Sequence, residues 1–155
     1  MKKLALVLLT VLSFTAAAGA QEFPNEPYEF LMAKLAAEEG DHDEALRRFD
    51  RIIDKNPGDP VLLYERAMIY IDAGRIDRAE TELRAVVKSN PDFYDANRIL
   101  GRLLLDRAGA DKTRIEEALG YLQSAYKANP DDLSTGIAVS QILSSLGRTN
   151  DAERV

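Results

Sequence analysis

Residues 40–60 read GDHDEALRRFDRIIDKNPGDP and combine a turn glycine, an amphipathic segment and a proline stop. The apolar residues of the segment are Ala45, Leu46, Phe49, Ile52 and Ile53. Their spacing of i, i+1, i+4, i+7 and i+8 places them on one face of a helix. Asp41 with Glu44 three residues later is typical of a capping box at a helix start. The stretch therefore predicts a helix from about Asp43 to Lys55, ended by Asn56-Pro57-Gly58.

The same pattern recurs along the chain at a nearly constant interval. Three pairs of landmarks are separated by one and the same interval: Gly40 and Gly74, Ala45 and Ala79, and Pro57 and Pro91. The next interval, from Ala79 to Ala118, is longer, and the last, from Ala118 to Ala152, again equals the first. Landmarks of three kinds that keep one interval indicate structural repeats. We expect the extra residues of the third repeat to lie in a stretched turn at residues 108–112.

These landmarks resemble the tetratricopeptide repeat (TPR) family, whose unit is a helix-turn-helix of about 34 residues, the interval seen here. That family has a small residue within the first helix, a turn glycine, an alanine opening the second helix, a bulky apolar residue four positions later and a proline near the end. The corresponding residues here are Ala33, Ala67, Gly101 and Ser140; Gly40, Gly74 and Gly147; Ala45, Ala79, Ala118 and Ala152; Phe49, Leu83 and Leu122; and Pro57, Pro91 and Pro130. The family's tryptophan is absent, and its place is taken by Glu29, Leu63, Asn97 and Gly136.

The resemblance covers about residues 26–155 and implies an all-α fold, a right-handed α-solenoid of three complete units and one partial unit. We expect the units at about residues 26–59, 60–93, 94–132 and 133–155, the last of them truncated. Helix starts are predicted from caps: Asn25 before the first helix, Asp59 with Pro60 at the first helical position, and Thr113 with Glu116 for a helix from Arg114 to Ala128. The second helix of the second unit is expected over residues 76–89.

A second expectation concerns the C-terminal face of the truncated last unit. In a repeat array the final unit exposes its stacking face unless a capping helix follows. We expect Val139, Leu143 and Ala152 to be left uncovered, because no complete helix follows them in this sequence. We therefore interpret the chain as a fragment or as a protein whose C-terminal end is a docking surface, and we expect self-association through that end.

Residues 1–20 read as a secretory signal peptide, and residues 21–25 as a short linker. Lys2 and Lys3 precede an apolar run from Leu4 to Phe14, and Ala18-Gly19-Ala20 supplies the small residues before the expected cleavage site. The alternative is an uncleaved membrane anchor. The chain has no cysteine, which excludes disulfides, thiolate chemistry and a lipid-bearing cysteine. We expect a periplasmic or secreted protein.

The charge balance argues against two classes of partner. Without the leader the chain has 18 basic and 26 acidic residues. An acidic body repels nucleic acid and anionic membrane surfaces, so we expect no nucleic acid and no membrane contact except through an uncleaved leader. His42, the only histidine, lies among Asp41, Asp43 and Glu44, where a metal site and a solvated turn are the two interpretations. We favour the turn, and we expect no metal, no cofactor and no enzyme activity, since no acid-base set is assembled.

The first helices of stacked units of this family line a groove, and their exposed positions can be read from the repeat. The candidate partner-binding residues are Phe30, Lys34, Tyr64, Met68, Ile71, Arg98, Arg102 and Gln141. Four of them form an apolar patch, and Arg98 with Arg102 forms a neighbouring basic pair. This pattern favours a peptide or helix with an apolar anchor followed by an acidic group. The alternative is that these side chains pack on one another or on the segment after the leader.

One TPR subtype binds C-terminal carboxylates through a set of lysine, asparagine and arginine side chains. The corresponding places here hold Phe30, Lys34, Glu65, Asp95 and Ile99, so that set is missing. We predict an extracytoplasmic TPR module that binds a protein partner in its groove and scaffolds an assembly. The alternative is the N-terminal recognition domain of a larger secreted enzyme or outer-membrane assembly or export protein.

Overall fold

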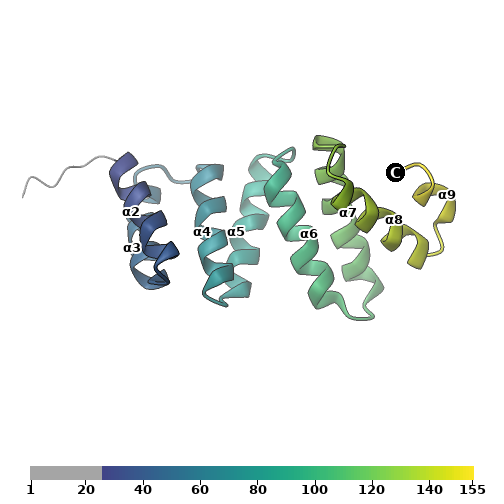
Figure 1. Ribbon diagram of the computed structural model, residues 1–155, viewed down its shortest axis with the longest axis horizontal. Helices are drawn as coiled ribbons and strands as arrows, with labels where there is room; N and C mark the ends of the chain where they lie inside the picture. Colours follow the sequence, from purple (N-terminus) through teal and green to yellow (C-terminus); the bar gives the residue numbers. More distant parts are fainter. Residues whose placement is uncertain (1–25) are drawn as a thin grey trace, which may run out of the picture.

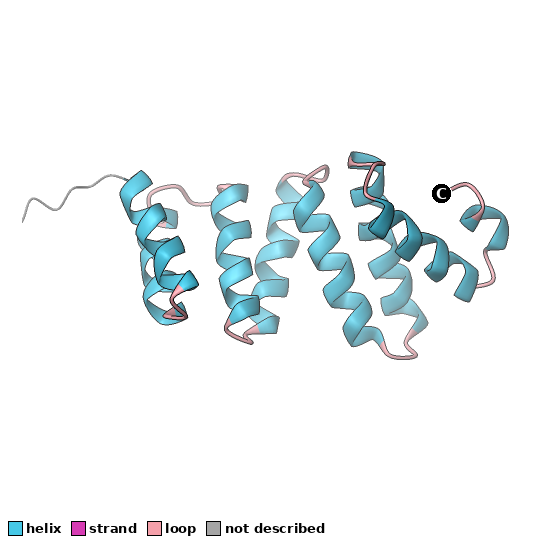
Figure 2. Cartoon of the chain, viewed as in Figure 1, coloured by secondary structure: helices cyan, strands magenta, loops and turns pink. Residues whose placement is uncertain are grey.

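The computed structural model describes residues 26–155, which form a row of helices (Figures 1 and 2). The helices are α2 (Glu26–Glu38), α3 (His42–Ile53), α4 (Pro60–Asp72), α5 (Ile76–Ser89), α6 (Tyr94–Ala108), α7 (Lys112–Ala128), α8 (Leu133–Ser145) and α9 (Thr149–Ala152). Residues 26–155 contain no strand. The predicted signal peptide, the linker and the Asn25 cap lie outside the described residues.

The extra residues of the third repeat lie in its helices, and the prediction of a stretched turn was wrong. Helix α6 has 15 residues and α7 has 17, whereas α4 has 13 and α5 has 14. The connections at 73–75 and 109–111 have the same length, as do those at 90–93 and 129–132. The additional residues are thus absorbed as about one and a half helical turns, which needs no new loop.

Aspartate caps begin four of the helices. The side chains of Asp41, Asp59 and Asp132 accept hydrogen bonds from backbone N–H groups of the first turn, as in other N-caps. For α7 the predicted cap was wrong. Asp111, and not Thr113, is the N-cap, and its carboxylate accepts from the backbone N–H of Thr113 at 3.0 Å, so the helix begins at Lys112. Asp111 is an equally good acceptor that lies two residues upstream, which explains the error.

The core runs through the row as three connected clusters. Small residues allow each first helix to approach its second: Ala33, Ala45, Ala67 and Ala79 are fully buried. Larger side chains such as Phe49 and Leu83 fill the remaining space and are also fully buried. Burying one such side chain stabilises the fold by about 1.5–3 kcal/mol. Neighbouring units share this core, because Ile69 of α4 belongs to the cluster formed by α2 and α3.

The last unit is better covered than the sequence suggests. Val139 and Leu143 are each 1% exposed, and Ala152 and Val155 pack against their cluster. The Tyr126 hydroxyl donates to the backbone oxygen of Val155 at 2.6 Å, and Ser140 donates to that of Ala152 at 2.9 Å. The expectation that Val139 and Leu143 are uncovered was therefore wrong, because the short helix α9 and the residues after it fold back onto α7 and α8.

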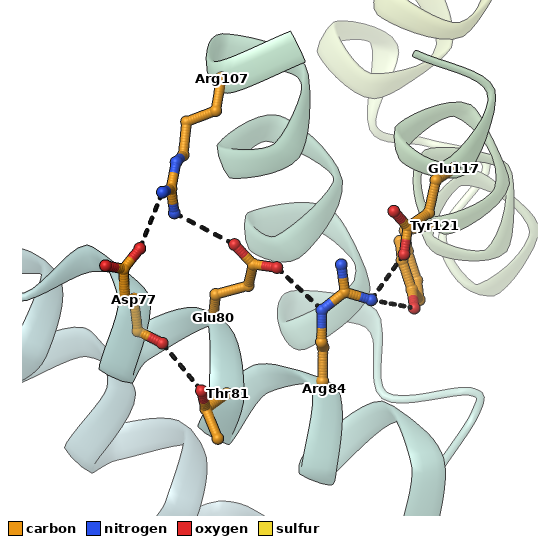
Figure 3. A network of polar contacts seen from close by, with 7 residues as sticks. All are labelled: Asp77, Glu80, Thr81, Arg84, Arg107, Glu117 and Tyr121. Atoms are coloured by element: carbon orange, nitrogen blue, oxygen red, sulfur yellow. Dashed lines mark hydrogen bonds and ion pairs between the residues drawn. The ribbon is translucent and has the colours of Figure 1, made fainter. Parts of the chain in front are cut away.

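Ion pairs also join successive helices. In Figure 3, Arg107 of α6 bonds to Asp77 and Glu80 of α5, at 2.7 and 3.1 Å. Arg84 of α5 bonds to Glu80 and extends to Glu117 of α7 at 2.6 Å. The bond to Glu117 raises the pKa of the Arg84 guanidinium above its usual range, although burial opposes this shift. The network thus connects side chains of α5, α6 and α7.

Candidate functional site

Helices α2, α4, α6 and α8 carry all of the predicted partner-binding residues, and their exposed side is called here the first-helix face. Phe30 lies edge-on against Phe49, with ring centroids 5.5 Å apart. Tyr64 packs on Phe93 at 5.4 Å, and burial raises the pKa of its phenol. Both rings are thus half-buried and engaged with the core. They are less available to a partner than the sequence pattern suggests.

The charged residues of this face differ in how firmly they are held. The ammonium group of Lys34 on α2 forms an ion pair of 2.7 Å with Glu65 on α4. Arg98 lies over the ring of Tyr94, and its guanidinium is 3.7 Å from Asp95. Arg102 is exposed and makes no ion pair with another residue in 26–155. Of the predicted basic pair, Arg98 is therefore engaged with Tyr94 and Asp95, whereas Arg102 can contact a ligand.

A cleft of about 620 Å³ lies between α4 and α6 and is called here the α4/α6 cleft. Its apolar lining comes from Met68, Ile71, Ile76, Ile99 and Leu103, and its remaining lining residues are Gly74, Asp77, Arg102, Asp106 and Arg107. This size lies within the range of about 300–1,000 Å³ that is typical of ligand pockets. Three predicted residues, Met68, Ile71 and Arg102, meet in it. Phe30, Lys34, Tyr64, Arg98 and Gln141 are not among its lining residues.

Four charged residues lie at the rim of the cleft. Two of them form an ion pair with each other, and the other two form none within residues 26–155. Arg107 and Asp77 are bonded to each other, as Figure 3 shows, so each already has an ion-pair partner. Arg102 and Asp106 lie one helical turn apart on α6, and neither forms an ion pair with another described residue. A ligand that places an apolar group in the cleft therefore meets a cation and an anion that have no ion-pair partner in the described chain.

Three apolar lining residues were missed in the sequence-based prediction: Ile76, at the start of α5, and Ile99 and Leu103 of α6. Ile99 and Leu103 occupy positions that face the preceding unit, whereas the prediction considered only positions that face outward. A signal was present, because Ile99 stands one repeat interval after Glu65 and replaces a charged residue with an apolar one. Val61 and Leu133, both strongly exposed on α4 and α8, were missed as well.

The described residues offer no metal centre and no membrane span. Within residues 26–155, no group of three His, Cys, Asp or Glu side chains is placed to hold a metal ion. His42 is the first residue of α3 and is half-buried. None of the helices in this part of the chain is long and apolar enough to cross a membrane.

The successive helix pairs of residues 26–155 make this protein a helical-repeat protein, with a cleft on one face of the row. The sequence profile of the tetratricopeptide repeat family matches residues 36–107. Together with the constant repeat interval and the helix-turn-helix units, this match identifies the chain as a member of the tetratricopeptide repeat family.

Similar proteins support the same assignment. A TPR repeat-containing protein of Pseudomonas aeruginosa is 36% identical over 98 residues, which are 63% of this chain; the chain spans 16% of that protein's length. The crystal structure of a TPR protein of Thermus thermophilus is 25% identical and superposes with a TM-score of 0.62, covering 84% of this chain and 70% of that one. The first TPR domain of Spaghetti, bound to an HSP90 peptide, is 21% identical with a TM-score of 0.64 and covers 79% and 93%.

Proposed function

We propose that this protein binds a segment of a partner protein on its first-helix face, outside the cytoplasm, and so holds that partner in an assembly. The α4/α6 cleft carries the proposal. It combines an apolar lining large enough for an aromatic or branched side chain with two rim charges that have no ion-pair partner among the described residues. TPR proteins mediate protein–protein contacts, and peptide binding by the Spaghetti domain is one example.

The chemistry of the cleft defines the expected ligand. An apolar side chain of the partner enters between Met68 and Ile99, and a carboxylate beside it meets Arg102. A basic group one turn further along meets Asp106. Recognition of a free C-terminal carboxylate by the lysine-asparagine-arginine set is not expected, because Glu65 and Asp95 occupy two of its positions.

A peptide display library, selected on the full chain, tests this function. The expected selected sequences share an apolar residue followed by an acidic one, and the selected peptides bind the protein with a 1:1 stoichiometry in calorimetry. Arg102→Glu should weaken those peptides at least about tenfold, which corresponds to about 1.4 kcal/mol. Arg78→Glu, an exposed arginine on α5, is the matched control and should leave the affinity unchanged. A selection without any common sequence, or equal loss in both variants, would reject the cleft as the site.

The proposed location rests on residues 1–20, whose charged start, apolar run and small residues fit a signal peptide. Expression of the full chain in a Gram-negative host, followed by intact-mass measurement of the protein from the periplasmic fraction, tests it. The expected mass is that of a chain beginning at Gln21. A full-length mass in the cytoplasmic fraction would contradict the proposal.

A second candidate function is the recognition part of a longer protein. The observation that favours it is that the Pseudomonas relative contains the matched segment as 16% of its length. The same cleft would then recruit a partner to the remainder of that protein. Sequencing of the genomic coding region decides between the two candidates.

A further inference from the structure

Helix α2 carries an apolar stripe that faces away from the other helices of residues 26–155. Tyr28, Leu31 and Leu35 lie one turn apart along it, and Leu31 is 64% and Leu35 43% exposed. The three residues are called here the α2 stripe. Helix α2 stands at the end of the row in Figure 1, so no described helix lies beyond it.

The repeat itself shows what covers this stripe elsewhere in the row. Leu35 corresponds to Ile69 one unit later and to Ile142 in the last unit, and these are 3% and 6% exposed. Ile69 packs with Leu46, Phe49 and Ile53 of α3. Ile142 packs with Leu119 and Leu122 of α7. At these two positions the cover is the second helix of the preceding unit, whereas Leu103, the equivalent residue of α6, is half-buried and lines the α4/α6 cleft. The α2 stripe thus occupies the position of a surface that receives a helix in two of the three following units.

The charges around the stripe select the kind of helix. Residues 26–55 contain nine acidic and five basic residues. Four of the basic side chains, Lys34, Arg47, Arg48 and Arg51, are engaged with Glu65, Glu44 or Glu29. Glu38 and Glu39, at the end of the stripe, make no ion pair with another described residue, and the negative end of the α2 dipole adds to their field.

We propose that the α2 stripe docks a cationic amphipathic helix of a partner protein, which takes the place of a preceding second helix. Its apolar side packs on Tyr28, Leu31 and Leu35, and its flanking lysine or arginine side chains meet Glu38 and Glu39. A second copy of the chain brings another acidic surface to the same face, and an anionic lipid surface is repelled for the same reason. This surface lies on the edge of the row and is separate from the α4/α6 cleft.

Two synthetic helical peptides test the proposal. Both carry leucine at i, i+3 and i+7; one has lysine at the flanking positions and the other has glutamate. Fluorescence anisotropy of the labelled peptides is measured with the full chain. The lysine peptide is expected to bind at least tenfold more tightly than the glutamate peptide, and the Glu38→Lys/Glu39→Lys variant should reverse this preference.

Matched variants separate the stripe from general attraction to an acidic protein. Leu31→Gln should weaken the lysine peptide at least tenfold, whereas Leu133→Gln, at an even more exposed leucine on α8, should leave it unchanged. Sealing the α4/α6 cleft with Met68→Lys/Ile99→Glu should also leave it unchanged, so failure of the cleft proposal does not affect this one. Equal binding of the two peptides, equal loss in the two leucine variants, or sedimentation that shows a dimer abolished by Leu31→Gln would overturn the proposal.

Discussion

Neighbouring first helices meet at three boundaries on the first-helix face, which are called here seams. A polar contact bridges two of these seams, whereas the middle one is lined by apolar side chains. Between α2 and α4, Lys34 and Glu65 form an ion pair of 2.7 Å. Between α6 and α8, the hydroxyl of Tyr94 donates to Asp132 at 2.6 Å. The middle seam has Met68 and Ile99 where the first has Lys34 and Glu65, and there the apolar α4/α6 cleft lies open.

The comparison shows that the repeat backbone and the binding surface are determined by different positions. The small and bulky core residues recur from unit to unit and set the helix pairing. The positions that face the seams change from charged to apolar between units, so a site arises where two apolar residues meet and no polar bridge forms. A site in such an array is therefore found by comparing equivalent positions for differences.

The largest effect on stability is expected from disturbing α6, the helix that forms one side of the α4/α6 cleft. A Cβ added at Gly101 of α6 would lie 2.7 Å from Cγ of Leu122 and 3.1 Å from the backbone oxygen of Ala118. Leu122 is buried and has little room to yield, so Gly101→Ala should lower the free energy of unfolding by about 1–3 kcal/mol. Urea denaturation followed by circular dichroism measures this. Gly120→Ala on α7, whose Cβ meets nothing within 4 Å, is the control and should stabilise by about 0.5–1 kcal/mol. Equal effects of the two substitutions would contradict the close helix approach at Gly101.

The next prediction transplants the closed seam into the open one. Met68→Lys with Ile99→Glu reproduces the Lys34–Glu65 pair at the equivalent positions. The affinity for peptides selected on the wild-type chain should fall at least about tenfold, or about 1.4 kcal/mol, because the apolar lining is lost. Calorimetric titration measures the affinity, and the free energy of unfolding should change by less than about 1 kcal/mol, since both side chains are only half-buried. Undiminished affinity would mean that the ligand binds elsewhere.

Much of the fold could be predicted from the sequence, because the core landmarks recur at a fixed interval. The end of α5 at Ser89 and the caps at Asp41 and Asp59 agree with the prediction, since a cap is a local interaction. The start of α7 was missed, because Asp111 and Thr113 are both good caps and the sequence pattern does not rank one above the other.

The site was less predictable than the fold. The partner of Lys34, Glu65, lies 31 residues away and is identified only by its distance in the folded chain. The partners of Arg98, Asp95 and Tyr94, lie three and four residues before it on one helix, so helical spacing could have indicated them. Whether the groove residues bind a partner stays a prediction. The sequence pattern identifies the face, and the structure identifies which of its side chains have no internal partner.

The third prediction concerns the polar bridge of the α6/α8 seam. Hydrogen bonds from Thr135, Tyr94 and Ser134 lower the pKa of Asp132 below its ordinary value of 3.8. A lowered carboxyl pKa stabilises the fold above that value, and the contribution is lost as the pH falls through the folded-state pKa. Tyr94→Phe should therefore lower the free energy of unfolding by about 1 kcal/mol at pH 7 and by nearly as much at pH 4, because the folded-state pKa of Asp132 lies below both pH values.

Urea titrations of both proteins at the two pH values measure this difference, with Tyr28→Phe on the exposed side of α2 as control. An equal loss from Tyr94→Phe in an Asp132→Asn background would show that the tyrosine acts by packing and not through the carboxylate.

The smallest effect on stability is expected when the ion pair between α2 and α4 is removed. Lys34 and Glu65 are partly exposed, and such ion pairs typically contribute about 0.2–1 kcal/mol. A double-mutant cycle with Lys34→Met and Glu65→Ile should give a coupling free energy in that range, smaller at high salt because exposed charges are screened. The double variant has two apolar residues where the middle seam has Met68 and Ile99, so it should gain binding of an apolar fluorescent dye that neither single variant shows. If the coupling is insensitive to salt, or the double variant binds no dye, then the identity of these two positions does not decide whether a seam is open, and the explanation of the α4/α6 cleft must lie in the spacing of the helices.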